Sequence, residues 1–278
     1  MNTEFEKLKI VTRYELLKQF RRKRFYGALV IVILAQILVI GLYKGLDLPT
    51  ALSKPSLGII IADSPELFAI FMVSMTSFAV LAAVFFAGDA IASEFEHKTG
   101  YVLFPNPVKR STIVIGKYLA CFLATLVILS IGYVISAIAL LVLYQGIPVG
   151  ILGSLAISIA LVFGVLGIAF FFSSLLKGGM GATIATLIIF MVVSPIIRSS
   201  LSYTGHEPWF LPDYAGDAVS STYNINFAQI FGGTLSGGGM QGMMTMTPNP
   251  VVSFFVLLIY ALVTLLASIW LTKRKEMT

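Results

Sequence analysis

The chain has 278 residues, of which 58% are hydrophobic and only 12% charged, and its mean hydropathy is +0.93. This composition lies outside the range of soluble globular domains and indicates an integral membrane protein. The net charge of +6 comes without a basic stretch that carries interleaved aromatic residues. Nucleic-acid binding is therefore not expected, and anionic lipid headgroups explain the cations better. A single cysteine, Cys121, excludes an intrachain disulfide.

Residues 1–24 predict an amphipathic helix that lies in the membrane interface. Its apolar residues recur at steps of three and four, while lysines and arginines occupy much of the remaining circumference. A basic cluster, Arg21-Arg22-Lys23-Arg24, then precedes the first apolar run. Such a helix can anchor the chain to anionic lipid without any further role. The apolar positions are Ile10, Val11, Tyr14, Leu17 and Phe20.

Six uncharged runs are each about as long as the roughly 20 residues that a helix needs to cross a bilayer core. They are continuously apolar instead of alternating, which favours helices over barrel strands. We therefore predict an all-α integral membrane protein with six transmembrane helices. Pro195 is expected to kink or end the fifth. The spans are expected at about 25–43, 67–88, 118–144, 147–176, 178–197 and 251–272, within a transmembrane domain of residues 25–272.

The lysines and arginines predict the orientation, because short loops rich in them tend to stay in the cytoplasm. With the N-terminus inside, the cytoplasmic segments hold sixteen of the 19 basic residues, and only Lys44, Lys54 and Arg198 lie outside. Both termini, including the tail at 273–278, are therefore predicted to be cytoplasmic. The location is a cell membrane, crossed several times. No small-residue cleavage site follows the first run, so a retained span is expected instead of a signal peptide.

None of the six runs contains an aspartate, glutamate, lysine, arginine or histidine. Buried ionisable groups are the usual mark of proton relays and ion-coupled carriers, so their absence from the runs argues against a proton-driven antiporter. The remaining polar groups, such as Gln36 and scattered hydroxyls, are expected to join neighbouring helices. The sequence contains no HExxH or GxSxG motif and no paired membrane aspartates, and no catalytic residue is assigned.

The loop at 89–117 has an unusual composition for a connector. Residues from Asp89 to about Phe95 can continue the second helix beyond the membrane, with Glu94 and Glu96 solvated. Gly100 then offers a break, and a short apolar patch at 101–104 precedes two prolines. Lys117 is expected to face the lipid headgroups. The patch is suited either to docking on another protein or to lying on the lipid interface as an amphipathic turn.

The predicted outer loop, residues 198–250, is longer than an ordinary connector and holds two distinct halves. The first is rich in aromatic residues and fits a small folded cap or a partner surface. The second contains the string TLSGGGMQ at 234–241, which resembles the LSGGQ sequence of ATP-binding cassettes. The chain has no GxxxxGK[ST] phosphate loop, however, so a turn-rich segment is the simpler interpretation. Soft thioether ligands for Cu(I) are a weaker alternative, at Met240, Met243, Met244 and Met246.

The pattern Asp89-x-Ile91-x-x-Glu94-x-Glu96, Thr99-Gly100, Pro107-Val108-x-Arg110 and Gly116-Lys117 resembles the first cytoplasmic loop of the type-two ABC exporter permeases, which include the NosY-like proteins. Chain length, six spans and a long outer loop extend the resemblance to nearly the whole chain. In that family this loop carries a coupling helix that sits in a cleft of the ATPase subunit. The resemblance implies coupling residues at Asp89, Glu94, Glu96, Thr99, Gly100, Tyr101, Leu103, Phe104, Pro107 and Arg110.

The resemblance also implies that the N-terminal helix is an elbow helix bordering the ATPase, with Tyr14, Leu17, Phe20, Arg21 and Arg22 as its candidate residues. Asp89 and Glu94 are expected to pair with arginines or helix ends. The implied function is the permease subunit of an ATP-driven exporter, with a separate ATPase subunit that binds ATP and magnesium and with a second permease copy or a sister permease. The alternatives are an ATP-independent facilitator or channel, or a membrane assembly subunit whose outer loop binds a partner protein.

Overall fold

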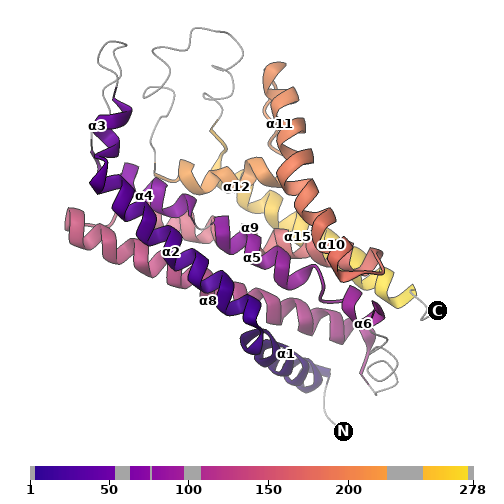
Figure 1. Ribbon diagram of the computed structural model, residues 1–278. Coiled ribbons are helices and arrows are strands. Elements are labelled where there is room, and N and C mark those ends of the chain that lie inside the picture. The colour runs from indigo at the N-terminus through magenta and orange to yellow at the C-terminus, as the bar shows by residue number, and fades with distance from the viewer. Residues whose placement is uncertain (1–3, 54–62, 76, 97–107, 224–246, 275–278) are drawn as a thin grey trace.

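A computed structural model describes residues 4–53, 63–75, 77–96, 108–223 and 247–274 of the chain. Within these ranges the protein is helical and contains no strand, and six helical segments are long and apolar enough to cross a membrane. The predicted fold class, an all-α membrane protein with six spans, is thereby confirmed. Figure 1 shows the long helices as a bundle in which both chain termini lie at one end.

Thirteen helical elements make up the part of the chain that the structure describes. The first three spans and the short helices beside them are α1 (Glu4–Arg21), α2 (Lys23–Gly45), α3 (Leu48–Leu52), α4 (Pro65–Ser74), α5 (Ser77–Ala87), α6 (Ala92–Glu96) and α8 (Arg110–Tyr144). The rest are α9 (Gly150–Leu175), α10 (Gly179–Ile188), the π-helix η2 (Ile189–Val193), α11 (Ser194–Tyr203), α12 (Pro212–Ser221) and α15 (Pro250–Arg274). Below, "the α1 end" is the end of the bundle that carries α1 and α6, and "the α12 end" is the opposite one.

The second span is divided into α4 and α5. Ser64 precedes α4 and caps it, because its Oγ accepts a hydrogen bond from the backbone N–H of Leu67 at 3.1 Å. Near the division, the buried side chain of Gln36 donates through Nε2 to the carbonyl of Met72 at 3.2 Å. Gln36 therefore joins α2 to α4, as expected for a polar group within a span.

The fifth span differs from the prediction at its far end. Proline lacks the N–H that an α-helix needs, and Pro195 lies in the first turn of α11, directly after η2. The wider π turn accommodates the proline, and the helix then continues to Tyr203 instead of ending at residue 197. Arg198, predicted to lie in a loop, is consequently part of this helix. The third span also begins earlier than expected, at Arg110 instead of residue 118.

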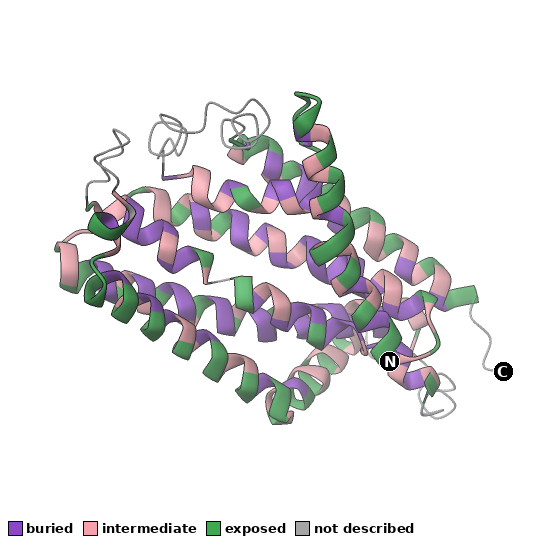
Figure 2. Cartoon of the chain, turned by 45° about the horizontal axis from the view of Figure 1, so that its top comes forward, coloured by how far each residue is buried: buried purple, intermediate pink, exposed green. Residues whose placement is uncertain are grey.

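The core lies along α9, at the centre of the bundle. In the most apolar stretch of α9, 61% of the residues are buried, against 17% in the α10–α11 span. Gly164 allows α15 to approach closely, because a Cβ at this position would lie 3.1 Å from the carbonyl oxygen of Leu257. Figure 2 shows the buried residues gathered in the central helices and exposed ones along α2 and α11.

Part of the predicted outer loop is folded. The helix α12 packs against α9 and α15 and buries Tyr214, Ala215 and Ala218. The first half of the 198–250 segment therefore forms a small cap on the α12 end, while Trp209 and Phe210 on its surface are exposed. The four methionines of the second half lie outside the described residues.

Candidate functional site

The helix α1 lies along the first half of α8, as Figure 1 shows. The contact is close at Gly116, where a Cβ would lie 2.6 Å from Cγ1 of Val11. A glycine at this position of α8 therefore allows the two helices to approach. Nearby, the buried Gln19 donates through Nε2 to the Sγ atom of Cys121 at 3.3 Å.

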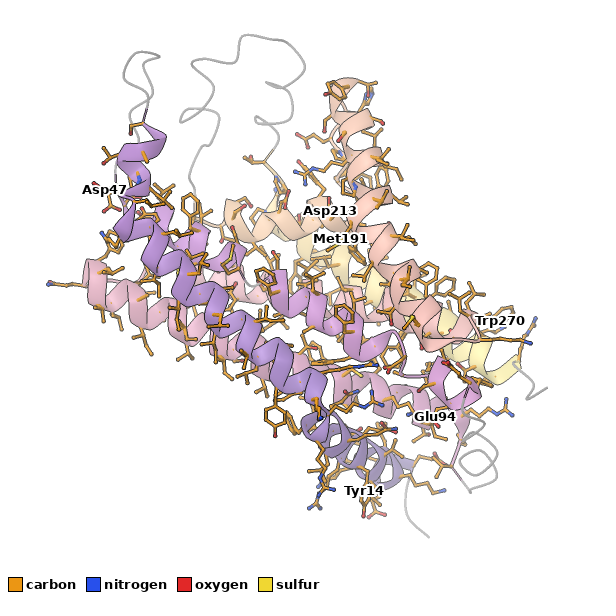
Figure 3. All side chains as sticks on the ribbon, in the orientation of Figure 1. Tyr14, Asp47, Glu94, Met191, Asp213 and Trp270 are labelled. Atoms are coloured by element: carbon orange, nitrogen blue, oxygen red, sulfur yellow. The ribbon has the colours of Figure 1, made fainter. Side chains whose placement is uncertain are left out.

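Only part of the predicted apolar stripe of α1 faces the bundle. Tyr14 is 70% exposed, and Ile10 and Leu17 are also exposed, whereas the one buried residue of α1 is Gln19. Figure 3 shows Tyr14 on the side of α1 that points away from the bundle. The helix thus presents Ile10, Tyr14 and Leu17 outward and meets the bundle through a mixed face, on which Val11 and Phe20 lie beside Glu15 and Gln19.

A buried lysine connects α1, α6 and α8. Lys117 is only 4% exposed, and its Nζ donates to Glu15 on α1 and to Glu94 on α6, both at 2.8 Å. Lys18 lies 3.7 Å from the same Glu94 carboxylate. Two predictions are wrong here, since Lys117 does not face the headgroups and Glu94 is buried instead of solvated. The pairing explains why: each charge would be costly to bury without its partner.

The carboxylate of Asp89 connects the end of α5 to the junction of α1 and α2. It accepts a hydrogen bond from Nη1 of Arg24 at 2.6 Å, and Nη1 of Arg22 lies 3.5 Å away. Both acidic residues were expected to pair with arginines or helix ends. Pairing with arginine occurs at Asp89, whereas Glu94 pairs with lysines.

Two further contacts attach α6 to the fourth and fifth spans. Glu96 accepts a hydrogen bond from the backbone N–H of Gly179 at 2.9 Å, at the start of α10, where the helix dipole favours a carboxylate. The Oγ of Ser173 on α9 accepts from the N–H groups of Ile91 and Ala92, both at 3.0 Å. The side chain of Ser173 thus satisfies donors that a helix start leaves unpaired.

The start of α8 is also connected to the end of α15. Arg110 donates through Nη1 to the carbonyl oxygens of Thr272 and Lys273, at 3.2 and 3.3 Å. A cation at this position matches the negative end of the helix dipole. We call Glu15, Asp89, Glu94, Glu96, Arg110 and Lys117 the charged cluster. Its contacts link α1, α2, α6, α8, α10 and α15, and Ser173 adds α9.

The remaining candidate residues are divided between described and undescribed parts of the chain. Phe20 packs edge-on against Phe25, with ring centroids 4.8 Å apart, and Arg21 is exposed. Thr99, Gly100, Tyr101, Leu103, Phe104 and Pro107 lie outside the described residues, so the predicted docking patch has no described structure. Sequence reasoning missed Glu15, Arg24 and Ser173, because their partners are more than 60 positions away in the chain.

The α12 end has its own polar contacts. Asp63 accepts hydrogen bonds from the hydroxyls of Tyr43, at 2.8 Å, and Tyr144, and its other oxygen lies 3.1 Å from Nζ of Lys44. Burial raises the pKa of Asp63, but the hydrogen bonds from the tyrosines and Lys44 outweigh it, so that the pKa lies below its ordinary value.

A second acidic group lies on α12. Arg198 on α11 approaches Asp213 at 3.5 Å and Asp217 at 2.5 Å. Burial raises the pKa of both aspartates, although the nearby guanidinium opposes the shift. Both also line a cavity of about 250 Å³ whose wall includes Met191 of η2 (Figure 3). Among the described residues, no group of three or more histidine, cysteine, aspartate or glutamate side chains could hold a metal ion.

Comparison with known proteins gives one family. Residues 10–277, nearly the whole chain, match the family described as "ABC-2 family transporter protein". No curated protein matches the chain. The match includes most of α1, the charged cluster and all six spans. The chain therefore belongs to the ABC-2 family of transporter proteins.

Proposed function

We propose that this permease subunit of an ABC transporter is driven by a separate ATPase through the segment 89–110, and that it exports its substrate. The observation that carries the proposal is the charged cluster. A segment that is to transmit motion from a partner must be attached firmly to the helices that move. At the α1 end, hydrogen bonds of 2.8 to 3.0 Å attach α6 to α8, α9 and α10, and Lys117 connects it to Glu15 on α1.

The mechanism follows from these attachments. ATP binding and hydrolysis occur on the partner, which holds the nucleotide and magnesium. Closure of the partner displaces the loop that begins after Glu96. Because Glu94 shares Lys117 with Glu15, α6 and the elbow helix α1 move together. Their displacement tilts α8 and α10, and the path between this chain and a second permease changes its access. Export instead of import is proposed from the resemblance of the 89–117 segment to exporter permeases.

The test is affinity purification of the tagged full-length chain from its native membrane, with mass spectrometry and an ATP-hydrolysis assay on the eluate. The proposal expects a protein with a GxxxxGK[ST] loop in stoichiometric amount and ATP hydrolysis that depends on it. The variant Tyr101→Ala/Phe104→Ala is expected to lose this partner by at least tenfold. Glu66→Ala, at the α12 end on α4, is the control and is expected to retain it.

A second variant separates docking from transmission. Glu96→Ala removes the bond to the start of α10 but leaves the 101–104 patch intact. It is expected to keep the partner bound while lowering the effect of the permease on ATP hydrolysis. If the purified chain holds no ATPase, and changes in 101–104 leave transport unchanged, the facilitator or assembly function replaces the proposed one.

A further inference from the structure

A groove between α2 and α5 is not used by the coupling arrangement. Its volume is about 520 Å³, within the range of binding sites for small molecules. Its walls are almost entirely apolar, and one charged residue, Arg24, lines it. The lining residues are Arg24, Gly27, Ala28, Ile31, Phe78, Leu81, Ala82, Phe85 and Phe86. In Figure 1, α2 and α5 lie next to each other on the side that faces the viewer.

The groove extends from the charged end of the span toward its middle. Arg24 and Ile31 are seven residues apart on α2, or about 10 Å along the helix axis. One wall is firm, because the buried ring of Phe86 stacks on Phe25 with centroids 6.3 Å apart. The other walls are open, since Ile31 and Phe85 are about half exposed. The space is therefore elongated, apolar and accessible from the hydrocarbon core.

Gly27 provides the width of the groove. A Cβ built at this position meets no atom within 4 Å, so the missing side chain leaves space that nothing in the described structure fills. Gly41, on the same helix but away from the groove, is equally open. The two glycines form a matched pair in which only one lines the groove.

The charge at the mouth selects the ligand. Arg24 follows Arg21, Arg22 and Lys23, so four basic residues cluster where α2 begins. The bond from Arg24 to Asp89 uses the Nη1 nitrogen, and a guanidinium carries five N–H donors arranged to fit a phosphate. A ligand with an acyl chain and an anionic phosphodiester matches both the apolar groove and the guanidinium of Arg24. We propose that the groove is a binding site for one anionic phospholipid, with its headgroup at Arg24 and an acyl chain beside Gly27.

The test measures bound lipid on the purified full-length chain by native mass spectrometry, with phosphatidylglycerol and phosphatidylcholine offered in equal amounts. The wild type is expected to retain one phosphatidylglycerol at least fivefold more often than phosphatidylcholine. Gly27→Leu fills the groove and is expected to lose this retained lipid. Gly41→Leu is expected to behave as the wild type.

A second arm uses surface charge and avoids changes in packing. Phosphatidylglycerol is expected to raise the unfolding temperature of the wild type more than phosphatidylcholine does. Arg24→Gln is expected to abolish this difference, and Lys23→Gln, which lies outside the groove, to keep it. Equal retention by Gly27→Leu and Gly41→Leu, or no preference for the anionic lipid, overturns the proposal. The proposal is also overturned if the purified chain carries no lipid and Gly27→Leu breaks its self-association. That result would assign the groove to a second copy of the chain.

Discussion

The two ends of the bundle are held together in different ways. At the α1 end the charges are shared around the buried Lys117, which pairs with two carboxylates, and the charged cluster links α1, α2, α6, α8, α10 and α15. At the α12 end the ion pairs are local and more exposed, since Asp63 joins α2 to α8 and Arg198 joins α11 to α12. The α1 end is therefore built to move as a unit, whereas contacts at the α12 end can separate one at a time.

The largest expected effect comes from removing the buried lysine. Lys117→Met leaves the carboxylates of Glu15 and Glu94 buried without their main partner, and breaking such an arrangement costs about 3–5 kcal/mol. Lys44→Met, in the half-exposed pair with Asp63, is the control and should cost less than about 1 kcal/mol. Unfolding in detergent, followed by circular dichroism, checks both. Equal losses of stability in Lys117→Met and Lys44→Met would contradict the distinction between the α1 end and the α12 end.

A smaller effect is expected where α1 meets α8. In Gly116→Val, the new side chain collides with Val11, and overpacking of this kind costs about 1–3 kcal/mol. Because α1 is the element that can yield, we expect faster tryptic cleavage within α1 than in the wild type. Gly41→Val, which has open space around it, should leave the cleavage rate unchanged. Unchanged cleavage in both variants would show that α1 is not held at Gly116.

The smallest effect is a difference in pH response between two aspartates of the α12 end. Asp63 has a lowered pKa, so its stabilising contribution is present above the pKa of the unfolded chain and is lost as the pH falls through the lowered value. Asp213 has a raised pKa, so its folded state is favoured at low pH and loses that advantage as the pH rises through the raised value.

Melting temperatures of Asp63→Asn and Asp213→Asn, measured against the wild type between pH 7 and pH 3, check this difference. On acidification the wild type should lose its advantage over Asp63→Asn and gain stability relative to Asp213→Asn. Shifts of the same sign in both variants would contradict the assigned environments.

Much of the fold follows from composition, because the solvent of a membrane protein imposes long apolar runs that are visible in the sequence. The six spans were accessible in this way. The burial of Lys117 could not be predicted from the sequence, because a lysine just before an apolar run usually faces the lipid headgroups. Only the tertiary structure brings Glu15, 102 positions away in the chain, next to the Nζ atom of Lys117.

The elbow helix shows the same limit. Periodicity identified an apolar stripe on α1, but it did not reveal which face meets the bundle. Ile10, Tyr14 and Leu17 of that stripe are exposed, whereas Val11 and Phe20 turn toward the bundle. Beside Val11, the contact with α8 uses Gln19 and Glu15, two polar residues that the sequence pattern alone places in solvent.

Cross-linking to the ATPase tests the central claim most directly. In a Cys121→Ser background, single cysteines are placed at Tyr14 on α1 and at Val149, which precedes α9 at the α12 end; these residues are 70% and 91% exposed. A thiol-to-amine cross-linker is then applied to the purified complex. The account predicts that the ATPase is captured from position 14 and not from position 149. Capture from position 149 alone would place the ATPase at the α12 end and contradict coupling through the charged cluster.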